Sequence, residues 1–442
     1  MTGPKSPPRP EPQGIGEEML GWARDLYPIR RSLSGPGVRE TLAYLKALLP
    51  DLQIHEIASG TQALDWEVPD EWTLREAFVE DEAGNRVIDI EDHGLHVLGY
   101  SESVDTTLDL EELQQHLHSL PDQPDAIPYV TSYYERRWGF CLNQRQRDAL
   151  KPGRYRVKID ADLGPGALNY ADLVLPGETG QEIVLSTYTC HPMMVNNELS
   201  GPVVATALAR WLTGRDRRFT YRFVFVPETI GAVIYLSRHM DHLKARTHAG
   251  FILTCIGDER GYSFLPSRLG TTIADRTARY VLDRYAPDYT AYSFLDRGSD
   301  ERQYCSPLVD LPFVSIMRSK YGSYPEYHTS LDDFSLVTAT GLEGGLSMMQ
   351  AAIRALEANN TYTATVPGEP QLGKRGLYPS LSTKESGLGV KAMINLLAYS
   401  DGNHDLLEIA ESIGADILHC ADIAKTLSEH GLLIRKDDLP YD

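Results

Sequence analysis

Four short apolar stretches of this chain each end in a polar cluster, and this pattern constrains the fold more than any other feature. The stretches are residues 183–188, 221–226, 251–253 and 313–317, and the residues that follow them are His191, Glu228, Asp258 and Tyr327-His328-Thr329. Apolar runs of this length predict buried strands. Because ligands bind outside the carboxyl ends of strands in open α/β sheets, we expect the four clusters to meet at one edge of a sheet.

Helical patterns alternate with these strands. Two helices are predicted before residue 50, on either side of the turn Ser34-Gly35-Pro36-Gly37. Apolar residues also recur at helical spacing in residues 203–212, 231–239, 271–285 and 341–355. Strands that alternate with helices indicate a mostly parallel or mixed sheet covered by helices. We therefore predict one discontinuous α/β domain formed by residues 14–60 and 158–375.

Four other parts of the chain have a different pattern. Residues 61–157 contain short apolar and polar alternations split by Gly, Pro, Asp and Asn, which predict a small β-rich domain inserted into the α/β domain. A stretch rich in Pro and Gly, residues 367–379, predicts a linker. Residues 385–438 then contain three helical patterns, with Gly414 between the second and third as in a helix-turn-helix. Residues 1–13 are predicted to be a disordered tail without the apolar core of a signal peptide.

Charge and composition argue against several classes of partner. No apolar run approaches the roughly 18–20 residues of a membrane span, so we expect no membrane partner. The five cysteines are scattered and lack a CxxC spacing, which favours a reducing cytoplasm. The net charge of −20 argues against DNA as a partner, and residues 391–442 hold only four basic residues against ten acidic ones.

The residue types at the strand ends are those of a zinc site. Catalytic zinc is held by histidine nitrogen and carboxylate oxygen, with one position left for water. A lone histidine is more often structural, but His191 and His328 follow equivalent strands, which favours metal binding. Glu198 and Asn197 offer an anionic and a neutral oxygen. Glu228 is predicted to be a general base, although a glutamate before a helix also complements the helix dipole.

Five motifs occur in order along the chain. They are Cys190-His191-Pro192, Asn196-Asn197-Glu198-Leu199-Ser200-Gly201, Pro227-Glu228-Thr229-Ile230-Gly231, Gly298-Ser299-Asp300-Glu301-Arg302 and Tyr327-His328-Thr329. This order resembles a bacterial aminopeptidase-like family of the zinc aminopeptidase superfamily, and the resemblance covers about residues 19–434. It implies a zinc-peptidase domain, an inserted β domain and a C-terminal winged helix. It also implies that His191 and His328 bind metal and that Glu228 is catalytic.

The chain departs from that superfamily at three positions where it has metal-binding carboxylates. The residues found there are Asn197, Thr229, and Thr254 with Cys255, with Asp258 three residues further on. Two adjacent zinc ions need anionic ligands to offset their repulsion. We therefore expect one zinc ion, held by His191, His328 and an oxygen of Glu198, with Asn197 as the alternative ligand. Glu198 is favoured because a charged oxygen compensates the ion better than an amide.

These residues predict a zinc-dependent hydrolase of an amide or peptide bond in a small peptide or amino-acyl conjugate. Asp300, Glu301, Arg302 and Tyr327 are expected to bind the substrate, and a structural ion-pair loop is the alternative for the first three. The resemblance implies a role in polysaccharide or specialised-metabolite assembly. The alternatives are a degenerate peptidase that senses a ligand, and an amide-forming or cyclising enzyme like the related glutaminyl cyclases. Assembly into a homo-oligomer is a further expectation.

Overall fold

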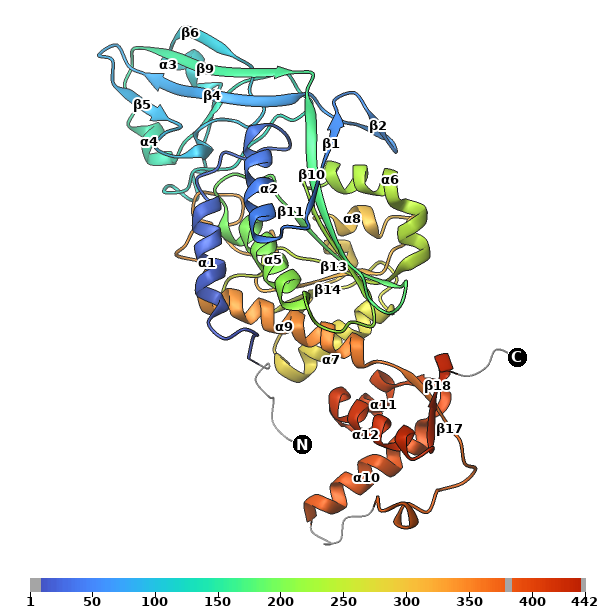
Figure 1. The fold of residues 1–442 in the computed structure, drawn as a ribbon. Helices are drawn as coiled ribbons and strands as arrows, with labels where there is room; N and C mark the ends of the chain where they lie inside the picture. Colours follow the sequence, from blue (N-terminus) through green and yellow to red (C-terminus); the bar gives the residue numbers. More distant parts are fainter. Residues whose placement is uncertain (1–8, 378–383, 439–442) are drawn as a thin grey trace.

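An eight-stranded mixed sheet lies at the centre of the chain, and four of its strands are the apolar stretches predicted from the sequence (Figure 1). Its strands in spatial order are β1 (Gln53–Ala58), β10 (Ala167–Leu175), β12 (Thr220–Val226), β11 (Glu182–Tyr188), β13 (Thr247–Ile252), β16 (Phe313–Met317), β14 (Ser263–Leu265) and β15 (Thr290–Ala291). Strands β12, β11, β13 and β16 are parallel neighbours. The computed structural model describes residues 9–377 and 384–438, with only the backbone at residues 384–388.

Helices cover both faces of this sheet because its central strands are apolar on both sides. In β11, Ile183 and Leu185 pack with one group of helices, whereas Val184 packs with the other. The first group is α1 (Ile15–Leu26), α2 (Pro36–Leu48), α5 (Ser200–Leu212), α7 (Ile273–Tyr285) and α9 (Ala339–Ala358), and the second is α6 (Ile230–Arg246) and α8 (Glu301–Tyr304). Each buried Val, Leu or Ile contributes roughly 1.5–3 kcal/mol. The predicted α/β class is confirmed.

The inserted segment forms a separate four-stranded antiparallel sheet at one end of the molecule (Figure 1). Its strands are β5 (Arg86–Asp89), β4 (Glu71–Glu80), β9 (Arg154–Gly164) and β6 (Val104–Asp109). Shorter elements accompany it: β2 (Gln62–Ala63), β3 (Trp66–Glu67), α3 (Leu110–Gln114), β7 (Leu117–His118), β8 (Phe140–Cys141) and α4 (Gln144–Asp148). Because β9 continues to Gly164, the predicted return to the large sheet at residue 158 is too early. The chain returns there with β10.

The C-terminal unit combines three helices with a three-stranded sheet. These elements are α10 (Lys384–Tyr399), α11 (Leu406–Ile413) and α12 (Ile417–Glu429), with the strand order β18 (Asp401–Asp405), β17 (Thr361–Ala364) and β19 (Leu433–Arg435). Gly414 ends α11 at a φ of 65°, as the predicted turn requires. Strand β17 lies before the predicted linker, so this unit begins earlier than residue 385. Residues 378 and 379 of the predicted linker lie outside the described residues.

This unit packs on the helices of the large sheet, on the α7 and α9 side (Figure 1). Arg276 of α7 pairs with Asp405 and Glu408. Ile417, at the first position of α12, donates its N–H to the hydroxyl of Tyr280 at 2.8 Å. The start of α12 is therefore held by the α/β domain.

The predicted disordered tail is partly ordered. Residues 1–8 lie outside the described residues, but Glu11 accepts hydrogen bonds from Arg215 Nη2 at 2.6 Å and from Trp211 Nε1 at 3.2 Å. These contacts anchor Glu11 to α5 and the turn after it. Within the described part of the chain, no helix combines the length and the apolar composition that crossing a membrane requires.

Candidate metal and catalytic site

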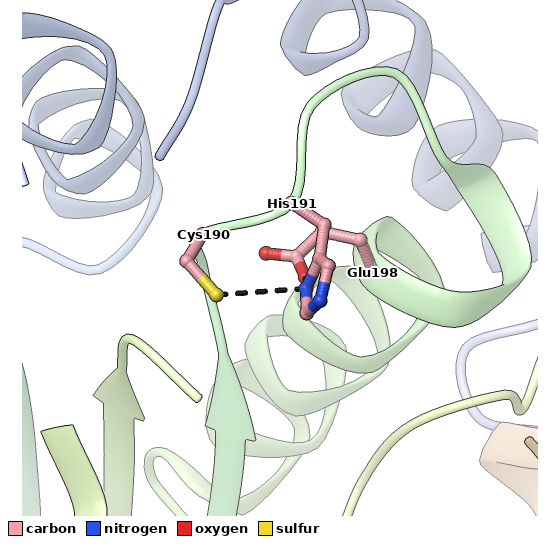
Figure 2. Close-up of side chains that lie close together, drawn as sticks. All are labelled: Cys190, His191 and Glu198. Carbon is pink, nitrogen blue, oxygen red and sulfur yellow. Dashed lines mark hydrogen bonds and ion pairs between the residues drawn. The ribbon is translucent and has the colours of Figure 1, made fainter. Parts of the chain in front are cut away.

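His191 lies just beyond the end of β11 and is 1% exposed. Its Nδ1 lies 2.7 Å from Glu198 Oε2 and 3.5 Å from Cys190 Sγ (Figure 2). Glu198 comes from a π-helical turn, η2 (Val195–Leu199), that leads into α5. Burial by itself lowers the pKa of His191, and the Glu198 carboxylate acts in the opposite direction. The imidazole is thus held from its Nδ1 side, and its Nε2 is left for other partners.

Cys190, His191 and Glu198 are close enough to suggest a metal site on the Nδ1 side. However, two ligand atoms of one tetrahedral zinc ion lie about 3.3 Å apart when their bonds to zinc are about 2.0–2.2 Å. The 2.7 Å between His191 and Glu198 is a hydrogen-bond distance instead. Burial also raises the pKa of the Cys190 thiol to about 11, which disfavours the thiolate that zinc binds. The geometry therefore favours Glu198 as the residue that orients His191, in place of the ligand role predicted for it.

Glu228 lies on the Nε2 side of His191, and His328 is a neighbour of the same imidazole. Glu228 Oε2 is 3.5 Å from His191 Nε2, and the His328 ring centroid is 5.2 Å from that of His191. His328 Nε2 is buried and has no hydrogen-bond partner among the described residues. Burial and the neighbouring His191 lower the pKa of His328 to about 3, so its imidazole is neutral. A buried, neutral imidazole nitrogen without a partner is suited to binding a metal ion.

Glu228 follows β12, and the backbone just after it is strained. Thr229 has φ 63° and ψ −74°, in a region that residues with a side chain rarely occupy. Its N–H donates to Asp300 Oδ1 at 2.7 Å, which holds this conformation. The Glu228 side chain is 18% exposed, and burial raises the pKa of its carboxyl group. These contacts hold a carboxylate of raised basicity beside the two histidines.

Asp300 and Glu301 are not open to a substrate, contrary to the prediction. Both are 0% exposed. Glu301 Oε1 accepts the N–H groups of Gly298 and Ser299 at 2.8 and 3.0 Å. Burial and the nearby Glu228 raise the pKa of Asp300 well above its usual value. Asp300 therefore supports the backbone of Thr229, and Glu301 supports its own loop, rather than a ligand.

Arg302 and Tyr327 are the two predicted substrate-binding residues that keep exposed surface. Arg302 is exposed and donates from Nη2 to Thr229 Oγ1 at 2.6 Å. Tyr327 stacks on His328, with ring centroids 3.9 Å apart and an interplanar angle of 15°. Arg302 therefore lies next to the residue that follows Glu228, and Tyr327 lies next to His328.

Two of the three positions that lack a metal-binding carboxylate, Asn197 and Thr254, belong to an internal hydrogen-bond network. Asn197 Oδ1 accepts from the hydroxyl of Tyr188 at 3.2 Å, and that hydroxyl also contacts Thr254 Oγ1 at 2.5 Å. Asp258, 0% exposed, accepts from Asn196 Nδ2 at 3.0 Å and is a structural residue. In these contacts, no carboxylate replaces the metal-binding carboxylates that the superfamily has at these positions.

Sequence reasoning missed Asp332, which connects the His328 loop to the Glu198 turn. Its buried carboxylate accepts the N–H groups of Val195, Asn196 and Asn197 at 3.1, 2.6 and 2.9 Å. It also accepts from the hydroxyl of Tyr324 at 3.0 Å. An acidic residue four positions after His328 was the only signal in the sequence, and the three N–H groups that it accepts lie more than 130 positions away.

Sequence reasoning also missed Tyr129, through which the inserted domain reaches the site. Its ring centroid lies 5.1 Å from that of His191 and 5.3 Å from that of His328. Its N–H donates to the His328 carbonyl at 2.9 Å, and its hydroxyl is 3.4 Å from that of Tyr133. No motif marks this tyrosine, because the contact depends on how the inserted domain docks.

A polar cleft of about 580 Å³ separates the inserted sheet from the turn between α1 and α2. Its lining includes Arg30, Trp72 and Gly94, which also line a cavity of about 30 Å³. That smaller cavity reaches Tyr129 and Pro192, next to the site. Neither space is lined by His191, Glu228 or His328. The site is therefore defined by the contacts among its side chains.

Comparison with known proteins assigns the chain to a family. Residues 20–359 match the family model described as Domain of unknown function (DUF4910), and residues 360–435 match that of a winged helix-turn-helix. A relative from Clostridium acetobutylicum, named "Putative polysaccharide biosynthesis protein with aminopeptidase-like domain", is 40% identical over 91% of this chain and 92% of its own length. The second match begins just before β17, in agreement with the pairing of that strand.

Solved structures share the fold. A crystal structure of a "putative peptidase" from Clostridium acetobutylicum is 39% identical to this chain and has a TM-score of 0.90. The match covers 95% of this chain and 96% of that one. A zinc aminopeptidase from Bacillus subtilis has a TM-score of 0.56 at 12% identity, over 80% of this chain and 96% of that one. The chain therefore belongs to the family described as Domain of unknown function (DUF4910), with an aminopeptidase-like fold followed by a winged helix-turn-helix.

Proposed function

We propose that this protein is a zinc-dependent hydrolase of an amide bond in a small peptide or amino-acyl conjugate. The observation that carries the proposal is the arrangement of His191, His328 and Glu228. Two imidazoles from strands more than 100 residues apart lie side by side, and a partly exposed carboxylate stands 3.5 Å from one of them. This combination is typical of metal-assisted hydrolysis.

The zinc ion would be held by Nε2 of His191 and Nε2 of His328. The buried, unpartnered Nε2 of His328 supports this assignment, as does the hydrogen bond from His191 Nδ1 to Glu198. When bound, zinc supplies a Lewis acid that polarises a carbonyl group. Glu198 would orient His191 rather than supply an oxygen ligand. One zinc ion per chain is expected, because Thr229 and Thr254 stand where further carboxylates would be needed.

Glu228 acts as the general base in this proposal. Its raised pKa suits it to take a proton from the attacking water and to pass that proton to the leaving amine. Asp300 has a positioning role, since it holds the strained backbone of Thr229 next to Glu228. The rings of Tyr129 and Tyr327 both pack against the His328 ring and limit the entry of bulk water to the site.

The name of the Clostridium acetobutylicum relative supports substrates from polysaccharide assembly, such as an amino-acyl sugar. Residence in the cytoplasm is part of the same proposal, and the five free, buried cysteines support it.

Metal analysis of protein purified without chelator tests the proposal. We expect about one zinc ion per chain in the wild type and in Cys190→Ala, and loss of zinc in His328→Ala. Two ions per chain would contradict the single-metal site. Loss of zinc in Cys190→Ala but not in His328→Ala would place the metal on the Nδ1 side of His191. A wild type without zinc would favour a ligand-sensing protein with a degenerate peptidase site.

A further inference from the structure

The acidic residues around Glu228 are closed to a ligand. Glu198, Asp300 and Glu301 act on the charge of Glu228, and Asp300 and Glu301 are 0% exposed while Glu198 is 1% exposed. Glu198 is engaged by His191, Asp300 by Thr229 N–H, and Glu301 by the Gly298 loop. A substrate with a free amino group next to the scissile bond would need such a carboxylate within reach. At this site the buried carboxyl groups do not offer one.

The open charge beside Glu228 is positive instead. Arg302 is exposed, and its guanidinium contacts the residue that directly follows Glu228. Thr229, the neighbour of Glu228, accepts from Arg302 Nη2 at 2.6 Å. The cation is therefore held at the rim of the site by a direct contact.

The hydrogen bonds of Arg302 leave part of its guanidinium available. Nε donates to the Ser299 carbonyl at 3.1 Å, and one hydrogen of Nη2 is used by Thr229. Nη1 and the second hydrogen of Nη2 have no partner among the residues that the structure describes. Two anchors fix the plane of the group, and the free Nη1–Nη2 edge has the spacing that a carboxylate accepts through two parallel hydrogen bonds.

We propose that Arg302 binds a carboxylate of the substrate, so that the protein acts on acidic amides rather than on peptides with a free amino group at that position. This inference rests on the proposed function, because it takes the amide to lie between Glu228 and the metal-binding histidines. A substrate ammonium group at the same place would face the Arg302 guanidinium, and Glu228, the partly exposed carboxylate nearby, is already engaged as the proposed base. Repulsion would therefore select against it.

Binding of three matched hydroxamates to the zinc-loaded protein tests this inference without a known substrate. The probes share one carbon chain and one hydroxamate, and they end in a carboxylate (succinic monohydroxamate), a neutral amide (its succinamide analogue) or an amine (β-alanine hydroxamate). Their affinities are measured by isothermal titration calorimetry. We expect the carboxylate probe to bind at least about tenfold more tightly than the amide probe, as a charge-assisted bidentate contact implies.

Arg302→Gln should abolish the preference for the carboxylate probe while changing the affinity for the amide probe less than about threefold. Arg297→Gln is the matched control, because Arg297 is an exposed arginine of the same loop that packs on Phe294. Its preference should equal that of the wild type. Arg302→Lys should retain part of the preference, since it keeps the charge but loses the planar edge.

Three results would overturn the inference. They are equal binding of the carboxylate and amide probes by the wild type, tightest binding of the amine probe, and an equal loss of affinity for all probes in Arg302→Gln. The last result would show that Arg302 only positions Thr229. If the purified protein held no zinc, the proposed function itself would fail first, and metal analysis before the titration separates the two failures.

Discussion

Asp332→Ala should loosen the metal site without touching a proposed metal-binding residue. The substitution removes the carboxylate that accepts the N–H groups of Val195, Asn196 and Asn197 and the Tyr324 hydroxyl, although Val195 N–H keeps the Asp332 carbonyl as an acceptor at 2.9 Å. All three donors belong to buried residues at the start of the turn that carries Glu198. Without this acceptor, the turn has to open or admit water.

The size of the effect follows from those hydrogen bonds. A hydrogen bond to a charged acceptor contributes about 1.5–3 kcal/mol. Burial raises the pKa of Asp332 to about 6, so the carboxylate is ionised at pH 8 and the three bonds have full strength there. Water that enters the space left by the carboxylate restores part of the loss. We therefore expect the free energy of local opening to fall by about 3 kcal/mol, which corresponds to about 100-fold faster amide exchange.

Hydrogen–deuterium exchange measured by mass spectrometry at pH 8 gives this quantity for peptides that contain residues 195–197. Asp333→Ala is the control, because the Asp333 side chain accepts only from Ser335 N–H at the surface. The control should exchange within about threefold of the wild type in the same peptides. If Asp332→Ala folds and its residues 195–197 exchange no faster than those of the control, the positioning role assigned to Asp332 is wrong.

Three further outcomes are expected. Glu228→Gln should keep the zinc content and lower turnover about 10²- to 10⁴-fold on any active substrate, whereas retention of most of the rate would exclude Glu228 as the base. Burial, together with the positive charge of Arg218, lowers the pKa of His248 to about 4. Because the unfolded histidine binds its proton near pH 6.5, the contribution of neutral His248 to the free energy of unfolding should be complete above that pH and decrease as the pH falls toward 4. Denaturation midpoints between pH 7.5 and 4.5 should therefore fall less in His248→Phe, and equal slopes would contradict this. The full chain should give no salt-dependent mobility shift with duplex DNA at physiological salt, because its net charge is −20 and Ile417 at the start of α12 is docked on Tyr280.

The sequence by itself determined the large sheet and the order in which chemical groups reach its edge. Apolar runs of three to six residues between helical patterns predict buried strands, and parallel strands bring their carboxyl ends together. His191, Glu228 and His328 were predicted at these ends, and the structure brings them to one place. These features depend on local periodicity, so they can be read without knowledge of long-range contacts.

The tertiary structure decided what each polar neighbour does. The motif containing Asp300, Glu301 and Arg302 places charges in sequence, but only packing makes two of them buried supports and leaves the third exposed. Likewise, the roles of Glu198, Tyr129 and Asp332 follow from contacts between segments whose register no local pattern encodes. The physical reason is that burial and hydrogen-bond partners set the charge state and availability of a side chain, and both are properties of the assembled fold.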